Sequence, residues 1–512
     1  MRRPKNLSTA TVYILALVSG GIGILAYSPF DYWPIAFISA FGLLWVTITQ
    51  PKKIALIGSF LWAVSYFAVG VNWVQVSMTQ FGGVPEIVSY LAVLLLASYL
   101  ALYPLLFTYL SQQFNLKNPW VLASLFSFTE YLREIVFTGF PWLQFGYTQV
   151  DSPFYGLAPI TGVQGLTFFV ILISGYLVQI FYKLFRNKVI LYKPILMSVS
   201  ILILATFTQL FNFVEDDIEK QAVNISLIQG NIEQQIKWDP NYFNSTLATY
   251  NSLIFPLLGK SDVIIFPESA IPAMENNIVP ILSQLDSLGR KNHSQIIIGT
   301  LYQENNQLFN SAVVLGDPNH PYNMSQAQRY NKYHLVPFGE YVPFGKLLDW
   351  MRKVFILPVN LSRGNFIQSA LNIGNNSFNL AICYEIIFGD QVQQNQRQQQ
   401  SDYLVTISND AWFGTSSGPW QHLQMARMRA LELGKPLIRA TNTGITAFID
   451  FKGQIIKQAP QFEAITLTHS MHPTKGITPF TLLGHWLIYG ISLIILTFTI
   501  FFKYSKKYKM NK

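Results

Sequence analysis

The stretch FNLAICYE, at positions 378–385, is an apolar run that ends in a thiol and an acid. A short apolar run of this kind predicts a buried β-strand, which would deliver Cys383 and Glu385 at its end. Cys383 is the only cysteine in the chain, which excludes an internal disulfide bond and a cysteine-based zinc site. A free cysteine is more often a small buried hydrophobe than a nucleophile, so this stretch alone favours a structural role.

Five further β-rich runs lie around this stretch, between residues 215 and 479. They alternate with polar turns and helix-like segments, which predicts a layered α/β domain. A helix is expected over Trp420–Leu433, because Gly434 and Pro436 are residues that end helices. The Gln/Asn-rich patch at 393–400 is interpreted as an exposed loop. The five β-rich runs are 223–229, 262–266, 295–300, 311–315 and 403–408.

Two charged residues follow other runs of the same region. Glu268 lies in the strand-like run VIIFPES at 263–269, and Lys332 lies in the loop-like run RYNKYHLVPFGEYVPF at 329–344. Each of them alone would ordinarily be a solvated charge. Together with Cys383 they supply a thiol nucleophile, a carboxylate that can accept its proton and a cation for a developing oxyanion. This combination predicts nucleophilic acyl transfer.

Other catalytic chemistries have weaker support in the sequence. His334 and His422 lie near these motifs, but no Cys-His-Asn spacing is evident, so histidine is the poorer candidate for the base. The sequence contains no HExxH pattern and no acidic cluster of the kind that binds metal. We therefore expect an enzyme that uses neither a metal ion nor a cofactor.

The composition indicates a membrane protein. Only 12% of the 512 residues are charged and 51% are hydrophobic, whereas about a quarter of the residues of a soluble protein are charged. The net charge of +9 would suggest a nucleic-acid partner, but eight of the positive charges lie in two short terminal tails. Basic tails beside apolar segments are topology signals that face anionic lipid, so we exclude nucleic acid as a partner.

Eight apolar runs are long enough to cross a hydrocarbon core of roughly 30 Å. The fifth run carries Glu130, Arg133 and Glu134, so a count of seven spans stays open. With the N-terminus inside, lysine and arginine collect in the expected inner loops and are absent from the outer loops 75–85 and 138–157. The eight runs lie near 10–27, 34–49, 54–74, 86–110, 119–137, 158–182, 194–214 and 480–502.

This topology divides the chain into three parts. Residues 1–214 would form a helical membrane domain with seven spans, and residues 215–479 an extracytoplasmic α/β domain. Residues 480–512 would form the last span and a basic cytoplasmic tail. The apolar start is expected to stay as the first span, because no small-residue cleavage site interrupts it.

The motifs of Glu268, Lys332 and Cys383 resemble the catalytic motifs of the nitrilase superfamily. The surrounding sequence is similar to its membrane-bound branch, the apolipoprotein N-acyltransferases, over nearly the whole chain. The resemblance implies an αββα sandwich for the α/β domain, in a multi-pass protein of the bacterial inner membrane whose catalytic domain is periplasmic. The segments that carry it are 141–142, 229–232, 237–238, 266–268, 331–344, 383–385, 408–414 and 424–427.

The resemblance also implies the reaction and its partners. The acyl donor would be a membrane phospholipid, typically phosphatidylethanolamine, and the acceptor the α-amine of an S-diacylglyceryl cysteine at the N-terminus of an apolipoprotein. Glu268 would take the proton of Cys383, and Lys332 would stabilise the oxyanion and lower the pKa of the thiol. A thioester would then pass the acyl chain to the amine, which is the last step of lipoprotein maturation. The enzyme is expected to be a monomer.

The same resemblance assigns supporting residues. Glu340 and Glu385 would position the lysine and the nucleophile. The apolar stretch at 347–357 is interpreted either as a lid that dips into the membrane interface or as an amphipathic helix packed on the domain. The expected substrate-binding or lid residues are Trp142, Trp238, Tyr384 and Trp412.

Two other functions stay open from the residues alone. A membrane-anchored amidase or nitrilase could use the same three residues to hydrolyse a soluble substrate, but it would need only one anchor. A transporter or a lipid sensor with an inactive α/β domain would have no need for Glu268, Lys332 and Cys383 together. The intact set therefore favours an enzyme that acts on lipid.

Overall fold

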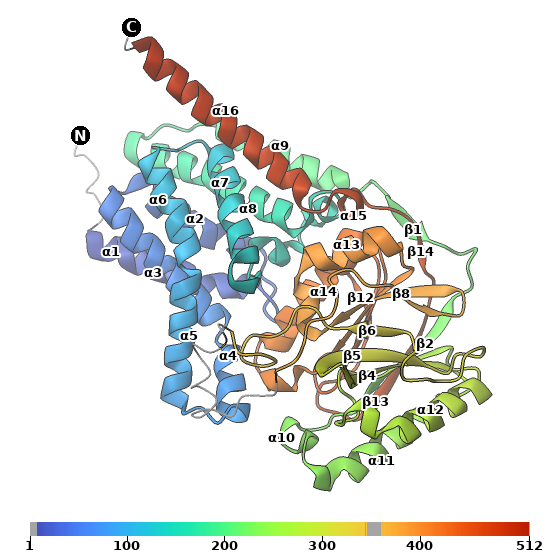
Figure 1. The fold of residues 1–512 in the computed structure, drawn as a ribbon. Coiled ribbons are helices and arrows are strands. Elements are labelled where there is room, and N and C mark those ends of the chain that lie inside the picture. The colour runs from blue at the N-terminus through green and yellow to red at the C-terminus, as the bar shows by residue number, and fades with distance from the viewer. Residues whose placement is uncertain (1–7, 344, 346–359, 511–512) are drawn as a thin grey trace. The chain divides into compact units, whose positions relative to one another are not determined.

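The computed structural model describes residues 8–343, 345 and 360–510, which form two compact units (Figure 1). The first unit contains the residues up to Gln75, Glu86–Asn212 and the residues from Leu483 onward. The second unit contains Val76–Pro85 and Phe213–Leu482. The short segment Val76–Pro85, which the sequence placed in a loop between two spans, thus packs with the α/β unit.

Helices make up the first unit. Among the described residues, five helical segments are long and apolar enough to cross a membrane: Thr9–Ala26, Lys52–Gly70, Glu86–Gln113, Tyr155–Arg186 and Trp486–Lys503. Two more apolar helices, α2 and α9, are shorter. The helices are α1 (Thr9–Gly21), α2 (Pro34–Thr49), α3 (Lys52–Gly70), α5 (Glu86–Leu100), α6 (Leu102–Gln113), α7 (Pro119–Ile135), α8 (Ala158–Asn187), α9 (Tyr192–Thr208) and α16 (Trp486–Met510).

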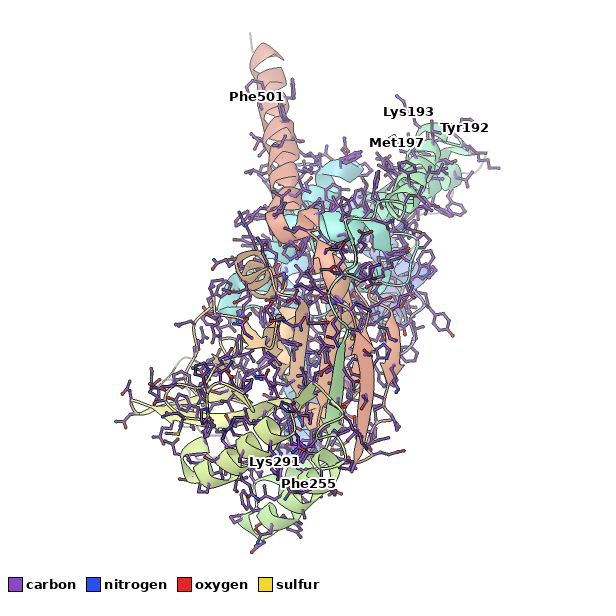
Figure 2. The ribbon with its side chains drawn as sticks, turned by 90° about the vertical axis from the view of Figure 1, so that its right-hand side faces the viewer. Tyr192, Lys193, Met197, Phe255, Lys291 and Phe501 are labelled. Carbon is purple, nitrogen blue, oxygen red and sulfur yellow. The ribbon has the colours of Figure 1, made fainter. Side chains whose placement is uncertain are left out.

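The outer surface of this unit suits a lipid environment. Tyr192 at the start of α9 and Phe501 of α16 point away from the ribbon in Figure 2, and they are 77% and 65% exposed. Many other large apolar side chains of these helices are also exposed. An apolar surface of this extent would be unfavourable in water, which supports a membrane location.

The charged residues of the fifth apolar run lie inside the helical unit, on α7. Arg133 donates to Glu130 at 2.5 Å and to two main-chain oxygens of the following loop. Glu134 accepts hydrogen bonds from Gln164 and from Tyr489 of α16, each at 3.0 Å. All three charged side chains are buried, so they are paired within the bundle instead of facing lipid.

Two six-stranded sheets form the second unit (Figure 1). One has the order β13-β2-β3-β4-β5-β6 and the other the order β7-β8-β9-β10-β11-β12. All six strands expected from the sequence are confirmed. The bounds are β2 (Val223–Gln229), β3 (Val263–Ile265), β4 (Gln295–Glu304), β5 (Gln307–Leu315), β6 (Arg329–Asn331) and β13 (Ile465–Met471), then β7 (Leu371–Ile373), β8 (Asn376–Ile382), β9 (Tyr403–Ser408), β10 (Leu437–Thr441), β11 (Ala447–Ile449) and β12 (Ile455–Gln458), with a separate pair β1 (Val214–Asp216) and β14 (Thr474–Gly476).

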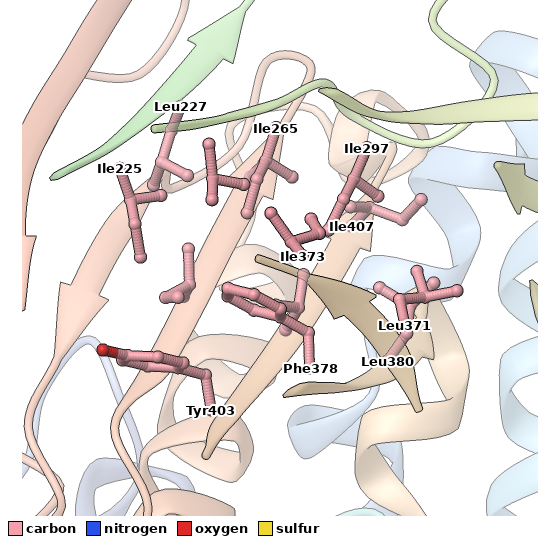
Figure 3. Close-up of a cluster of buried hydrophobic side chains, with 14 of the residues drawn as sticks. Ile225, Leu227, Ile265, Ile297, Leu371, Ile373, Phe378, Leu380, Tyr403 and Ile407 are labelled. Carbon is pink, nitrogen blue, oxygen red and sulfur yellow. The ribbon is translucent and has the colours of Figure 1, made fainter. Parts of the chain in front are cut away.

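Alternate residues of the strands form the core between the sheets. Leu227 of β2 and Ile265 of β3 pack in one buried cluster with Phe378 and Leu380 of β8 (Figure 3). Because successive side chains of a strand point to opposite faces, the intervening residues, such as Ile264, face outward. These residues pack against α11 (Phe243–Ile254) and α12 (Val279–Lys291). With α13 (Gly389–Gln399) and α14 (Gly418–Leu433) on the other sheet, the layers form the expected αββα sandwich.

The prediction of an exposed loop at 393–400 is wrong, because most of this segment belongs to helix α13 (Gly389–Gln399). Gln393, Asn395 and Gln396 are buried, and their amides donate to main-chain oxygens at 2.6, 2.9 and 2.8 Å. Composition suggested exposure, but polar side chains can be buried when they are hydrogen-bonded. The helix expected over Trp420–Leu433 is present as α14 (Gly418–Leu433).

Candidate active site

The candidate site lies where strands of both sheets end. Cys383 directly follows β8 and Asn409 directly follows β9, whereas Lys332 directly follows β6 and Glu268 lies three residues after β3. Strands β3 and β6 belong to one sheet, and β8 and β9 to the other. The sandwich thereby brings together a thiol, a carboxylate and an amine that are far apart in the sequence.

Cys383 lies at a sharp turn between β8 and the short helix η10 (Cys383–Ile387). Its φ of +52° is in the left-handed region, which residues other than glycine rarely adopt. A backbone of this kind persists only where its surroundings hold it, and it is often found at functional sites. A strained turn from strand to helix also presents the side chain at its tip, as a nucleophile requires.

Glu268 is a buried carboxylate with both oxygens occupied. Its Oε1 accepts a hydrogen bond from Asn310 Nδ2 at 2.7 Å and lies 3.3 Å from Lys332 Nζ. Its Oε2 accepts from the main-chain N–H of Asn409 at 2.9 Å. Burial raises the pKa of Glu268, but Lys332 and these hydrogen bonds outweigh it, so the pKa lies below its ordinary value. Glu268 is therefore ionised at neutral pH.

Lys332 lies between two carboxylates. Its Nζ is 3.3 Å from Glu268 Oε1 and 2.9 Å from Glu340 Oε2, and its side chain is 1% exposed. Burial lowers the pKa of Lys332, but Glu268 and Glu340 raise it above its ordinary value. Glu340 is itself fixed, because it accepts hydrogen bonds from Asn310 Nδ2 at 2.9 Å and from the main-chain N–H of Val336 at 2.8 Å. The amine is therefore a fixed cation.

The pKa of the Cys383 thiol lies well above its ordinary value. Burial and the negative charge of Glu268 raise this pKa, and Lys332 lowers it, as expected, but by less than the other two raise it. One cation cannot offset both the lost hydration and the carboxylate. The resting site consequently holds a neutral thiol beside an ionised carboxylate, the state from which a general base can act.

Glu385 joins the cysteine segment to the lysine segment through their main chains. Its Oε2 accepts from the N–H of Ile382, next to Cys383, at 2.8 Å. Its Oε1 accepts from the N–H of Tyr333, next to Lys332, at 2.7 Å. Glu385 is fully buried and fixes the residues beside the thiol and the amine, which supports the positioning role expected for it.

Replacing Glu385 by leucine should misplace the nucleophile. The N–H groups of Ile382 and Tyr333 would lose their acceptor, and each unpaired buried group costs about 1–3 kcal/mol. A displacement of about 1 Å can cost on the order of 100-fold in rate. We expect a loss of this size in acyl transfer, measured in detergent with purified protein. Glu304→Gln, at an exposed glutamate, is the control and should keep the wild-type rate.

The sequence did not single out Lys237 as a site residue, although it noted the pair Lys237-Trp238. Lys237 ends the short helix α10 (Gln234–Lys237), is 1% exposed and donates to the main-chain oxygen of Glu268 at 3.1 Å. Burial lowers the pKa of Lys237 to about 8, although Glu268 and Cys383 raise it. In the structure, its burial beside Glu268 marks Lys237 as a site residue. The burial of a single lysine cannot be read from the sequence.

The charge of Lys237 should make stability depend on pH. Its folded pKa of about 8 is below the unfolded value of about 10.4, so the unfolded chain binds more protons between these pH values. The free-energy cost of burying the protonated Lys237 amine is therefore full below about pH 8 and disappears as the pH rises towards about 10.4. Lys237→Met removes this cost. We therefore expect the thermal unfolding midpoint of the variant minus that of wild type to be smaller at pH 10 than at pH 7.

Thermal unfolding in detergent at the two pH values measures this difference. The control is Lys260→Met, which makes the same substitution at an exposed lysine. An equal, pH-independent offset for the Lys237 variant would contradict the assignment of a buried titrating amine.

The four expected substrate-binding or lid residues have different surroundings. Trp238 follows Lys237 and is 46% exposed, whereas Tyr384 is partly buried with its ring 5.1 Å from that of Phe388. Trp412 is 37% exposed. Trp142 lies in the helical unit, where it is 1% exposed and packs on Trp73 and Phe140, which does not suit a mobile lid. The stretch at 347–357 lies outside the described residues.

The segment Val76–Pro85 contacts the loop after β9. Ser77 Oγ donates to the main-chain oxygen of Trp412 at 2.7 Å, and the rings of Phe81 and Trp412 meet edge to face at 5.3 Å. The same loop carries Asn409, whose N–H binds Glu268. A segment between two apolar helices thus supports the loop that holds the candidate base.

No group of three or more histidine, cysteine, aspartate or glutamate side chains that could hold a metal ion lies in the described part of the chain. The family model of the carbon-nitrogen hydrolases matches residues 224–474, which form the sandwich, so the second unit is of the carbon-nitrogen hydrolase class. A second family model, the apolipoprotein N-acyltransferase N-terminal domain, matches residues 19–176.

Relatives extend the similarity to the full length. An apolipoprotein N-acyltransferase of Haemophilus ducreyi is 59% identical over 98% of this chain and 99% of its own. One of Haemophilus influenzae is 50% identical over 96% of this chain and 95% of its own. A solved CN-hydrolase superfamily protein of Xanthomonas campestris is 18% identical, over 49% of this chain and 91% of its own, with a TM-score of 0.37. The chain belongs to the apolipoprotein N-acyltransferase family.

Proposed function

We propose that this membrane acyltransferase moves an acyl chain from a phospholipid, typically phosphatidylethanolamine, to the N-terminal α-amine of an S-diacylglyceryl-cysteine apolipoprotein. The acyl chain is carried between the two substrates as a thioester on Cys383. The observation that carries the proposal is geometric: the ends of β3, β6 and β8 bring Glu268, Lys332 and Cys383 into one site, where Lys332 Nζ lies 3.3 Å from Glu268 Oε1. The reaction itself follows from the family to which the chain belongs.

The first half-reaction forms the thioester. Glu268 accepts the proton of Cys383, and the thiolate attacks the ester carbonyl carbon of the phospholipid. Negative charge then develops on the carbonyl oxygen, where the amine of Lys332 stabilises it. The tetrahedral intermediate collapses, the C–O bond breaks and Glu268 returns its proton to the departing lysophospholipid oxygen.

The second half-reaction transfers the chain. The neutral α-amine attacks the thioester carbonyl, and Glu268 removes a proton from its nitrogen as the C–N bond forms. The C–S bond breaks, and the Cys383 sulfur takes the proton back from Glu268. The products are the N-acylated protein and the resting site, so neither a cofactor nor an external oxidant is needed.

A chain-exchange assay tests this function against simple hydrolysis. Purified protein in detergent is given phosphatidylethanolamine with defined chains and a diacylated lipopeptide acceptor, and the products are identified by mass spectrometry. We expect one lysophospholipid per amide formed, with the donor's chain on the lipopeptide nitrogen. Release of free fatty acid with no amide would instead support a membrane-anchored hydrolase.

We also propose that all eight apolar runs span the membrane, with the N-terminus and C-terminus in the cytoplasm and the α/β unit in the periplasm. All eight runs are helical, and the basic loops and tails support this orientation. A single cysteine placed at Asn306 or at Lys117, in a Cys383→Ala background, tests it in intact spheroplasts. An impermeant maleimide should label the Asn306→Cys protein only, and the opposite pattern would overturn the orientation.

A further inference from the structure

We propose that His422, held by Asp410 and Arg439, is a positioning residue that fixes the turn of Cys383 by donating a hydrogen bond to its main-chain oxygen. Ser408 in turn donates to Asp410. The inference rests on the proposed nucleophilic role of Cys383. The four supporting residues lie on β9, β10, α14 and the loop after β9, and all of them are buried.

The contact to the main chain fixes the proton of His422. His422 Nε2 lies 3.0 Å from Cys383 O, and a carbonyl oxygen can only accept, so Nε2 carries the proton. Nδ1 lies 3.1 Å from Nη2 of Arg439, and a guanidinium can only donate, so Nδ1 accepts. Burial and Arg439 lower the pKa of His422, which agrees with this neutral tautomer. The His422 ring therefore donates its proton to the turn at Cys383 in a hydrogen bond, and it is not the base for the thiol.

Asp410 holds the His422 ring through Arg439. Its Oδ2 accepts from Arg439 Nη2 at 2.6 Å, and the same Nη2 donates to His422 Nδ1 at 3.1 Å. Ser408 Oγ donates to Asp410 Oδ1 at 2.6 Å, which fixes the carboxylate from the other side.

These contacts form a hydrogen-bonded network from Ser408 through Asp410, Arg439 and His422 to the main-chain oxygen of Cys383. The network holds the carbonyl group of a residue whose left-handed φ of +52° persists only where its surroundings fix it. A hydrogen bond lost at the main chain would let the turn relax and move the sulfur away from Glu268. Positioning of this kind affects the rate of thioester formation and leaves donor binding unchanged.

A pair of substitutions separates positioning from packing. In His422→Gln, the side-chain amide nitrogen can take the place of Nε2 and donate to Cys383 O. His422→Leu fills a similar space without a donor. Single-turnover formation of the acyl adduct is measured on full-length protein in detergent, over a range of phospholipid concentrations. Wild type and Cys383→Ala are measured in parallel.

We expect His422→Leu to form the adduct about 10- to 100-fold more slowly with an unchanged half-saturating donor concentration, and His422→Gln to stay within about 3-fold of wild type. A wild-type rate in His422→Leu, or an equal loss in both variants, would overturn the inference. If neither variant folds, Ser408→Ala replaces them, with the same expected loss and the same contrary result. No adduct on wild type would instead overturn the proposed function.

Discussion

Glu268→Gln should lower the rate of thioester formation by about 100- to 10,000-fold, the usual contribution of a general base. Glutamine keeps the shape of the side chain and an oxygen for the N–H of Asn409, but it cannot take the proton of Cys383. Burial and the neighbouring carboxylate raise the pKa of that thiol, so very little thiolate forms without a base. The rate is measured in a single turnover with labelled phospholipid.

The pH dependence gives the same prediction an independent check. The pKa of Glu268 is lowered in the folded protein, so the base stays ionised until the pH falls below the ordinary value of about 4.3. Wild type should therefore show no loss attributable to Glu268 between pH 5 and 7. Glu304→Gln is the matched control for the change of charge. A glutamine variant at position 268 with a wild-type rate would eliminate Glu268 as the base.

Lys332→Met should damage both catalysis and stability. Removing a group that stabilises an oxyanion typically costs about 100- to 1,000-fold in rate. The same change leaves Glu268 and Glu340, which both accept from Asn310, as a buried and a partly buried carboxylate without their cation. Burial raises the pKa of Glu268 and Lys332 lowers it, so without Lys332 less of Glu268 is ionised and able to act as the base. Breaking a buried ion pair on one side costs about 3–5 kcal/mol, so the unfolding midpoint should fall as well.

A second substitution separates the two losses. Lys332→Met combined with Glu340→Gln removes one of the two unpaired charges, so the double variant should regain much of the lost stability. It should not regain activity, because the oxyanion still has no cation. Unfolding in detergent and single-turnover rates measure the two properties on the same samples. Activity that recovers together with stability would show that Lys332 acts only on the fold.

The sandwich was predictable because short apolar strands leave a clear pattern. The run that ends at Cys383 and the run that ends before Glu268 are strands β8 and β3, and both deliver their polar residue at the strand end, as expected. Lys332 could be proposed only together with the other two residues, because a lysine in a loop is ordinarily solvated. The motif resemblance supplied the link that composition and spacing lacked.

The misjudged features depend on long-range contacts. The burial of Gln393 and Asn395 in α13 needs acceptors on distant segments, and such acceptors leave no trace in the local sequence. The raised pKa of Cys383 depends on the balance of burial, Glu268 and Lys332, and the extent of the burial cannot be read from the sequence. The contacts of Lys237 with Glu268 and of His422 with Cys383 join distant parts of the sequence, so the sequence alone does not indicate them.

The central claim is that Cys383 carries the acyl chain, and intact-protein mass spectrometry tests it most directly. The purified full-length protein is incubated with a phospholipid of defined chains, and its mass is recorded before and after addition of a diacylated lipopeptide. We predict a mass increase of one acyl group located on Cys383, absent from Cys383→Ala, which disappears as N-acylated lipopeptide forms. Acyl transfer to the lipopeptide by Cys383→Ala at the wild-type rate would contradict the account.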